Sequence, residues 1–186
     1  MRIGAARFYY GRGEDFVQYK IGDYVSKPIT GVCKIADILQ LDMRGVKNDQ
    51  LYYLLLPVND EKEKIYVPVR TSDMNLRPCL TKEEAWNLIE RIPYIQSVWI
   101  ENEKMREHKY KEIIRTNDPE ALVSIIKMIY QRKRLRMQQG KKGTTSDEKY
   151  FQMAENLLYS EMGVALGKQK QEICQVISDF FKTKGA

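Results

Sequence analysis

Six cationic side chains lie within residues 131–142, and no acidic residue stands among them. They are Arg132, Lys133, Arg134, Arg136, Lys141 and Lys142. Positive charge at this density suits a polyanion such as nucleic acid, because cations that neutralise phosphates release condensed counterions. The competing interpretation is a solvated helix end, since cations also stabilise the C-terminus of a helix. The residues alone leave both interpretations open.

A second candidate surface lies at residues 101–115. Its cations share one helical face at i, i+4, i+7 and i+11, namely Lys104, His108, Lys111 and Arg115. The interleaved acids could instead form exposed ion pairs with them, each worth a few tenths of a kcal/mol; they are Glu103, Glu107 and Glu112. Trp99, just before this segment, is either a core anchor, which the usual burial of Trp favours, or an exposed wedge.

Residue types that could support catalysis or metal binding are few and scattered. His108 is the single histidine and stands in a cationic, solvated segment. Gly140–Gly143 lacks the spacing and the preceding strand of a phosphate-binding loop. The cysteines are far apart in sequence, which favours small buried side chains over a disulfide framework or a zinc site; they are Cys33, Cys79 and Cys174. We therefore expect no catalysis, no metal and no cofactor.

The composition is that of a folded protein, and its positive charge suggests an anionic partner, although many basic proteins bind none. The chain has 186 residues, 43% hydrophobic and 30% charged, with a net charge of +6. This length allows one large domain or two small ones. No apolar run reaches the roughly 20 residues of a membrane span, and the N-terminus lacks the apolar core of a signal peptide. A cytoplasmic protein without a membrane partner is expected.

Two halves with different periodicity follow an N-terminal extension, residues 1–16, to which no function is assigned. Phe16–Pro78 predicts four or five short strands in an SH3-like or Tudor-like barrel. Leu51–Leu56 suits a central strand buried on both faces. In Ile65–Val69, Pro68 lacks a ladder donor, which favours an edge strand.

From Thr81 onward the pattern becomes helical, and about five helices are expected. Thr81–Glu84 and Thr145–Glu148 have the form of capping boxes. Asn117–Glu120 predicts another helix start, with Pro119 in its first turn. The domain boundary is expected between Arg77 and Thr81.

The order and spacing of several motifs resemble those of the CarD-like (CdnL) family of bacterial transcription regulators. In the β segment the motifs are Gly22–Val25, Pro28, Gly31–Val32, Ile65–Val69 and Leu76–Pro78. In the helical segment they are Lys109–Lys111, Thr116–Asp118 and Thr145–Gly167. The resemblance implies an α+β protein of two domains. Residues 17–78 would be a Tudor-like RNA polymerase-interaction domain, and residues 81–184 a helical DNA-binding domain.

The resemblance also implies partners and contacts. The first domain would dock on the polymerase β subunit by strand addition, through Lys64, Tyr66, Val67 and Pro68. The second would bind promoter DNA at the upstream edge of the bubble, largely independently of sequence, and stabilise the open complex. Its implied contacts are Trp99, Lys104, Arg106, Lys109 and Lys111, together with the six cations of residues 131–142. A monomer is expected.

Two positions depart from the family pattern. Arg106 stands where some members carry a wedge tryptophan, so either Trp99 or Arg106 would contact the minor groove. Tyr66 stands where the polymerase-binding strand often has an arginine. Two other functions remain alternatives: an RNA-binding or ribosome-associated barrel protein, and an adaptor that binds only proteins.

Overall fold

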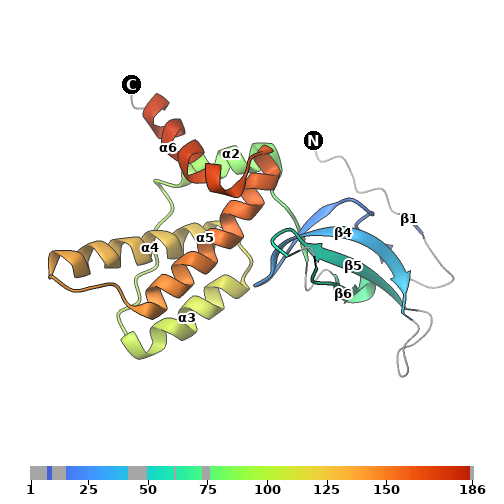
Figure 1. Ribbon diagram of the computed structural model, residues 1–186, viewed down its shortest axis with the longest axis horizontal. Helices are drawn as coiled ribbons and strands as arrows, with labels where there is room; N and C mark the ends of the chain where they lie inside the picture. The colour runs from blue at the N-terminus through green and yellow to red at the C-terminus, as the bar shows by residue number, and fades with distance from the viewer. Residues whose placement is uncertain (1–7, 10–15, 42–49, 61, 73–75, 185–186) are drawn as a thin grey trace. The chain divides into compact units, whose positions relative to one another are not determined.

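The computed structural model describes residues 8–9, 16–41, 50–60, 62–72 and 76–184 (Figure 1). The chain divides into two compact units, Met1–Cys79 and Leu80–Ala186. The first is built on an antiparallel sheet and the second on helices. The expected α+β class, with strands first and helices after them, is therefore confirmed.

The sheet unit contains five antiparallel strands in the order β6-β5-β4-β3-β7. Their bounds are β3 Tyr24–Lys27, β4 Gly31–Gln40, β5 Leu51–Pro57, β6 Ile65–Pro68 and β7 Arg77–Pro78. Among the strands that the structure describes, no pairing closes β6 onto β7, so the predicted barrel is seen as an open sheet. Each edge strand ends in a proline, Pro68 or Pro78, which has no N–H to donate to a ladder.

The core of this unit lies on one face of the sheet. β5 is central, between β4 and β6, as predicted. The prediction that this strand is buried on both faces is wrong, because Tyr53, Leu55 and Pro57 are buried while the residues between them are half-exposed. The buried Tyr53 hydroxyl accepts hydrogen bonds from the backbone N–H groups of Gln18 and Tyr19, at 3.0 and 3.1 Å. Nearer the N-terminus, β1 (Phe8–Tyr9) pairs with β2 (Phe16–Val17).

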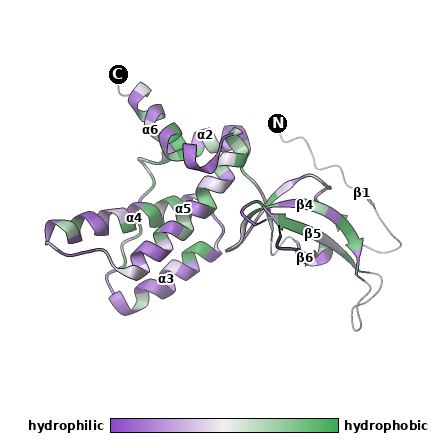
Figure 2. Ribbon diagram, in the orientation of Figure 1, coloured by the Kyte–Doolittle hydropathy of each residue, from purple (hydrophilic) through white to green (hydrophobic). Residues whose placement is uncertain are grey.

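The helical unit has five α-helices within its described residues. They are α2 Lys82–Arg91, α3 Glu103–Arg115, α4 Pro119–Gln138, α5 Thr145–Leu166 and α6 Ile173–Lys184. Apolar side chains from these helices form one core, whose largest fully buried members include Tyr110, Ile125, Met128 and Leu158. Figure 2 shows α4 becoming mainly hydrophilic toward its C-terminal end. None of the described helices is long and apolar enough to cross a membrane.

The helix starts agree with the sequence at two of three places. Thr81 and Glu84 form the predicted capping box of α2. Asp118 caps α4, with Pro119 as its first residue. The second predicted capping box is wrong, because Thr144 is the N-cap of α5 and accepts the N–H of Asp147 at 3.1 Å. The Asp147 carboxylate lies in the core of the unit instead of returning to the cap.

Gly163 is a buried position in α5 where a methyl group would not fit. A Cβ at this position would lie 2.9 Å from the backbone oxygen of Lys168, which follows the helix end. Gly→Ala inside a helix ordinarily stabilises by about 0.5–1 kcal/mol. We expect Gly163→Ala to destabilise instead, by roughly 1–2 kcal/mol, because the backbone must shift.

Urea unfolding monitored by circular dichroism measures this effect, with Gly143→Ala as the control. A Cβ at Gly143 has nothing within 4 Å. Equal midpoints for Gly163→Ala and the wild-type protein would contradict the predicted clash.

Candidate functional site

The first candidate site is the outer edge of β6. This strand pairs with β5 alone among the described strands, with Tyr66 opposite Leu54 and Val67 opposite Tyr53. Its position at the edge of the sheet confirms what Pro68 predicted. The edge carries backbone groups that no neighbouring strand occupies, which is the arrangement that strand addition requires.

The side chains predicted at this edge differ in what they can offer a partner. Tyr66 is 42% exposed, and Lys64, just before the strand, is also exposed. Pro68 is half-buried. Val67 is 4% exposed and belongs to the core, so its side chain is not available to a partner as the sequence suggested. Lys64 and Tyr66 therefore provide the side-chain contacts that this edge can make.

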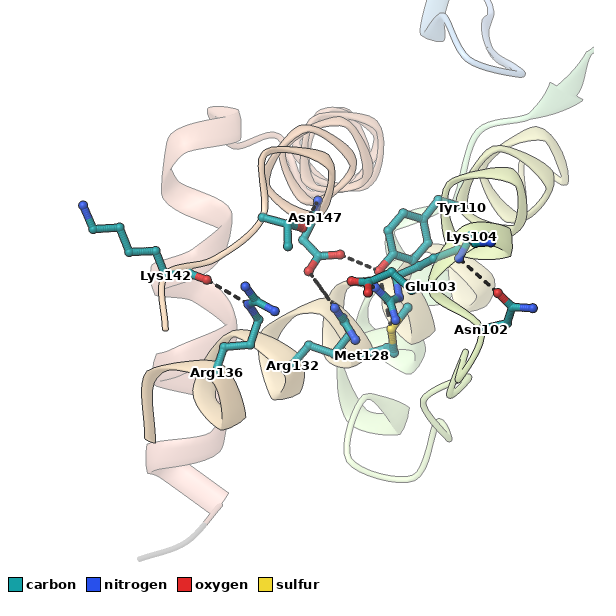
Figure 3. A network of polar contacts seen from close by, with 11 residues as sticks. Asn102, Glu103, Lys104, Tyr110, Met128, Arg132, Arg136, Lys142 and Asp147 are labelled. Carbon is teal, nitrogen blue, oxygen red and sulfur yellow. Dashed lines mark hydrogen bonds and ion pairs between the residues drawn. The ribbon is translucent and has the colours of Figure 1, made fainter. Parts of the chain in front are cut away.

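In the helical unit, one buried carboxylate joins three helices (Figure 3). Asp147 of α5 accepts a hydrogen bond from the Tyr110 hydroxyl of α3 at 2.8 Å. Its other oxygen forms an ion pair with Arg132 of α4 at 3.2 Å. Burial, and then the hydrogen bond to Asp147, raise the pKa of Tyr110 well above its usual range, so its hydroxyl remains a donor.

Arg132 and Arg106 are therefore misplaced by the sequence analysis. The Arg132 side chain is only 11% exposed and is held by Asp147. Arg106 is 8% exposed and pairs with Glu103 at 3.1 Å. Both were expected on a DNA-binding surface, and both side chains are instead largely buried.

Three further predicted cations are exposed but have an acidic neighbour. Lys109 pairs with Glu112 at 2.6 Å and Lys111 with Glu107 at 3.1 Å. Lys133 lies 3.6 Å from Glu148. These pairs are the exposed ion pairs that the interleaved acids made possible. Because surface pairs contribute about 0–1 kcal/mol, they do not prevent the lysines from contacting a phosphate.

The remaining predicted cations form the available charge. Among the described residues, Lys104, Arg134 and Lys142 are exposed with no acidic partner, and the amine of Lys141 donates to the side-chain oxygen of Gln139. Arg136 is half-buried, and its Nε donates to the Lys142 carbonyl at 2.8 Å. Arg134 and Arg136 lie in the last turns of α4, beyond its last buried residue, Ile129. Lys141 and Lys142 follow just after the helix ends.

The predicted burial of Trp99 is wrong. Its side chain is 50% exposed, while the next residue, Ile100, is 9% exposed and enters the core in its place. The expectation for the cysteines holds for Cys33, whose thiol pKa is raised to about 11 by burial, but not for the exposed Cys174. No group of residues suited to a metal ion occurs in the described part of the chain.

The sequence analysis missed two residues that organise this unit. Asp147 lies inside the predicted capping box Thr145–Glu148, where no role was predicted for it, and no local signal indicates that its carboxylate is buried. Lys127 is half-buried and donates to backbone carbonyls of the α2–α3 loop. It is the single cation in the apolar stretch from Ala121 to Tyr130. A lone cation in such a stretch could have indicated a half-buried amine with polar partners.

The architecture is that of a protein with a small antiparallel sheet unit followed by a helical unit. Residues 19–80, about a third of the chain, match the family model described as the CarD-like/TRCF RID domain. The sheet unit therefore matches that domain family, and the helical unit beyond Leu80 lies outside the match. Domains of that family are non-catalytic and interact with RNA polymerase. No curated protein matches the chain.

Removing the Asp147 carboxylate is expected to cost about 3–5 kcal/mol of folding free energy, because it leaves Arg132 buried without a counter-charge. Thermal and urea unfolding of Asp147→Ala test this. Lys133→Ala, which breaks an exposed pair, serves as the control and is expected to cost less than about 1 kcal/mol. The double variant Asp147→Ala/Arg132→Met should regain much of the loss. If Asp147→Ala and Lys133→Ala were equally stable, the assigned role of the carboxylate would be wrong.

Proposed function

We propose that this protein is a non-enzymatic transcription regulator that binds the RNA polymerase β subunit through β6 and promoter DNA through the helical unit. The observation that carries the proposal is the exposed β6 edge within a segment that matches a polymerase-interacting domain. The two activities are separate in the sequence, since the edge lies in residues 64–68 and the available cations follow Thr81.

The polymerase contact uses the backbone of β6 together with the outward side chains of Lys64 and Tyr66. Strand addition obtains affinity from main-chain hydrogen bonds and specificity from alternate side chains. Alternate residues of an extended strand share one face. Tyr66 and Pro68 of β6 therefore lie on one face, together with Lys64 just before the strand, while Ile65 and Val67 lie on the other. Tyr66 is the large exposed side chain on that outward face.

Tyr66→Ala is expected to weaken capture of the β subunit by about fivefold or more, because an aromatic anchor at an interface can contribute more than about 1 kcal/mol. Tyr24→Ala is a matched control, since Tyr24 is 41% exposed but lies on β3, an interior strand. Biosensor titration with purified β subunit measures both affinities. Equal weakening by the two variants would contradict the assignment of β6 as the docking edge.

The DNA contact rests on unbalanced positive charge. From Ala121 to Ser146 the chain contains Lys127, Arg132, Lys133, Arg134, Arg136, Lys141 and Lys142, with no Asp or Glu. Of these, Arg134, Lys141 and Lys142 are the exposed residues without an acidic partner among the described residues. Such charges bind phosphates and carry little sequence information. A protein that binds the open promoter better than the closed one stabilises the open complex without chemistry.

Binding of the free protein to a short DNA duplex is expected to weaken steeply with salt. Arg134→Gln/Lys141→Gln/Lys142→Gln should reduce the slope of log K against log salt by about 0.9 for each phosphate that the variant no longer neutralises. The control is Lys20→Gln/Lys34→Gln/Lys62→Gln, which removes the same charge from exposed positions of the sheet unit. Fluorescence anisotropy at several salt concentrations gives both slopes. A flat salt response of the wild-type protein would refute the DNA-binding half of the proposal.

A further inference from the structure

The loop between α2 and α3 is held against α4 by hydrogen bonds. The Lys127 amine donates to the carbonyl oxygens of Ile92 at 2.9 Å, Pro93 at 3.2 Å and Ile95 at 2.5 Å. The Ser124 hydroxyl donates to the Gln96 carbonyl at 2.8 Å and accepts the Val98 N–H at 3.0 Å. Gln131, one turn after Lys127 on α4, accepts from the Ser97 hydroxyl at 3.0 Å. This loop is therefore positioned before any partner binds.

The held loop presents large side chains to solvent. Tyr94 is 81% exposed, Val98 48% and Trp99 50%. On α4, Tyr130 is 55% exposed and lies one turn after Lys127. The Lys127 amine binds the carbonyl groups of the residues before and after Tyr94. Exposed rings thus stand on two elements that these hydrogen bonds hold together, and none of the rings belongs to the core cluster.

The charge beside Tyr130 is positive. Arg134 follows Tyr130 by four residues and therefore lies next to it on the surface of α4. It is exposed and has no acidic partner within the described part of the chain. The whole stretch Ala121–Ser146 contains no acidic residue. An anionic partner would thus be favoured where it covers Tyr130. At the other end of the loop, Trp99 is followed by the exposed Glu101 and Glu103.

We propose that Tyr94, Trp99, Tyr130 and Arg134 form a binding platform for single-stranded nucleic acid. Unpaired bases stack on aromatic side chains, while a cation follows the phosphate backbone. A duplex hides the faces of its bases and can use only the phosphate contacts of such a surface. This inference deepens the proposed function. It rests on that function in one respect, namely that the bound strand is the unpaired region of an open promoter.

The test compares a fluorescein-labelled single strand of thymidines, the same length of uridines, and a DNA duplex, each titrated with the full chain. Tyr94→Ala and Tyr130→Ala should each weaken single-strand binding about 5- to 150-fold, the range found when one stacked base loses its aromatic partner. Duplex affinity should change less than twofold. Tyr130→Phe keeps the ring and should bind as the wild-type protein does, and Tyr24→Ala of the sheet unit is the control for removal of an exposed tyrosine.

Quenching of tryptophan fluorescence by the thymidine strand gives a second readout. The chain has two tryptophans, Trp86 and Trp99, and Trp86 stacks on Phe180. Quenching should therefore persist in Trp86→Phe and disappear in Trp99→Phe.

The outcomes separate this inference from the proposed function. No measurable single-strand binding by the wild-type protein, or equal weakening on single strand and duplex, would overturn the platform. If the wild-type protein bound the single strand but not the duplex, only the proposed duplex contact would be contradicted. Binding of thymidines over uridines supports DNA as the strand, and the reverse order supports RNA. Unchanged affinity for all three probes in Tyr94→Ala and Tyr130→Ala would mean that another partner, such as a protein, covers the rings.

Discussion

The helical unit depends on one buried carboxylate. Asp147 lies three residues after the cap of α5, and its two oxygens reach Tyr110 of α3 and Arg132 of α4. A buried charge is tolerated when it is paired and hydrogen-bonded, and here both conditions are met within one side chain. The relative positions of three helices are thus fixed where α4 leaves the core. The cations beyond Arg132 follow from this, because the helix continues past the last buried position and its side chains meet solvent.

The same constraint divides the positive charges into two kinds. Arg132 and Arg106 are internal and serve packing, whereas Arg134, Lys141 and Lys142 lie outside and have no acidic partner among the described residues. A net charge of +6 does not distinguish them. What matters for a polyanionic partner is the charge that remains exposed after folding, and that charge is concentrated at the end of α4.

Much of the fold could be predicted from the sequence, but less of the candidate site could. Pro68 indicated an edge strand because its effect on a ladder is local, and Thr81 with Glu84 indicated a helix start for the same reason. Asp147 and Trp99 could not be placed in this way. Asp147 is only an intervening residue of the predicted capping box Thr145–Glu148, yet long-range partners on α3 and α4 bind its carboxylate. Trp99 resembles a core residue, yet Ile100 takes the buried position beside it. Burial of a single side chain is decided by tertiary packing, which periodicity does not report.

The manner in which α4 holds the α2–α3 loop has a consequence for how this surface can change in evolution. Lys127 and Ser124 bond to backbone atoms of the loop and not to its side chains. Any residue other than proline could therefore occupy the Tyr94 or Trp99 position while the loop kept its course. Related chains can vary these outward residues, and so adapt their specificity, without losing the scaffold. Sequence differences at these two positions would accordingly indicate a change of binding specificity and not a loss of the binding surface.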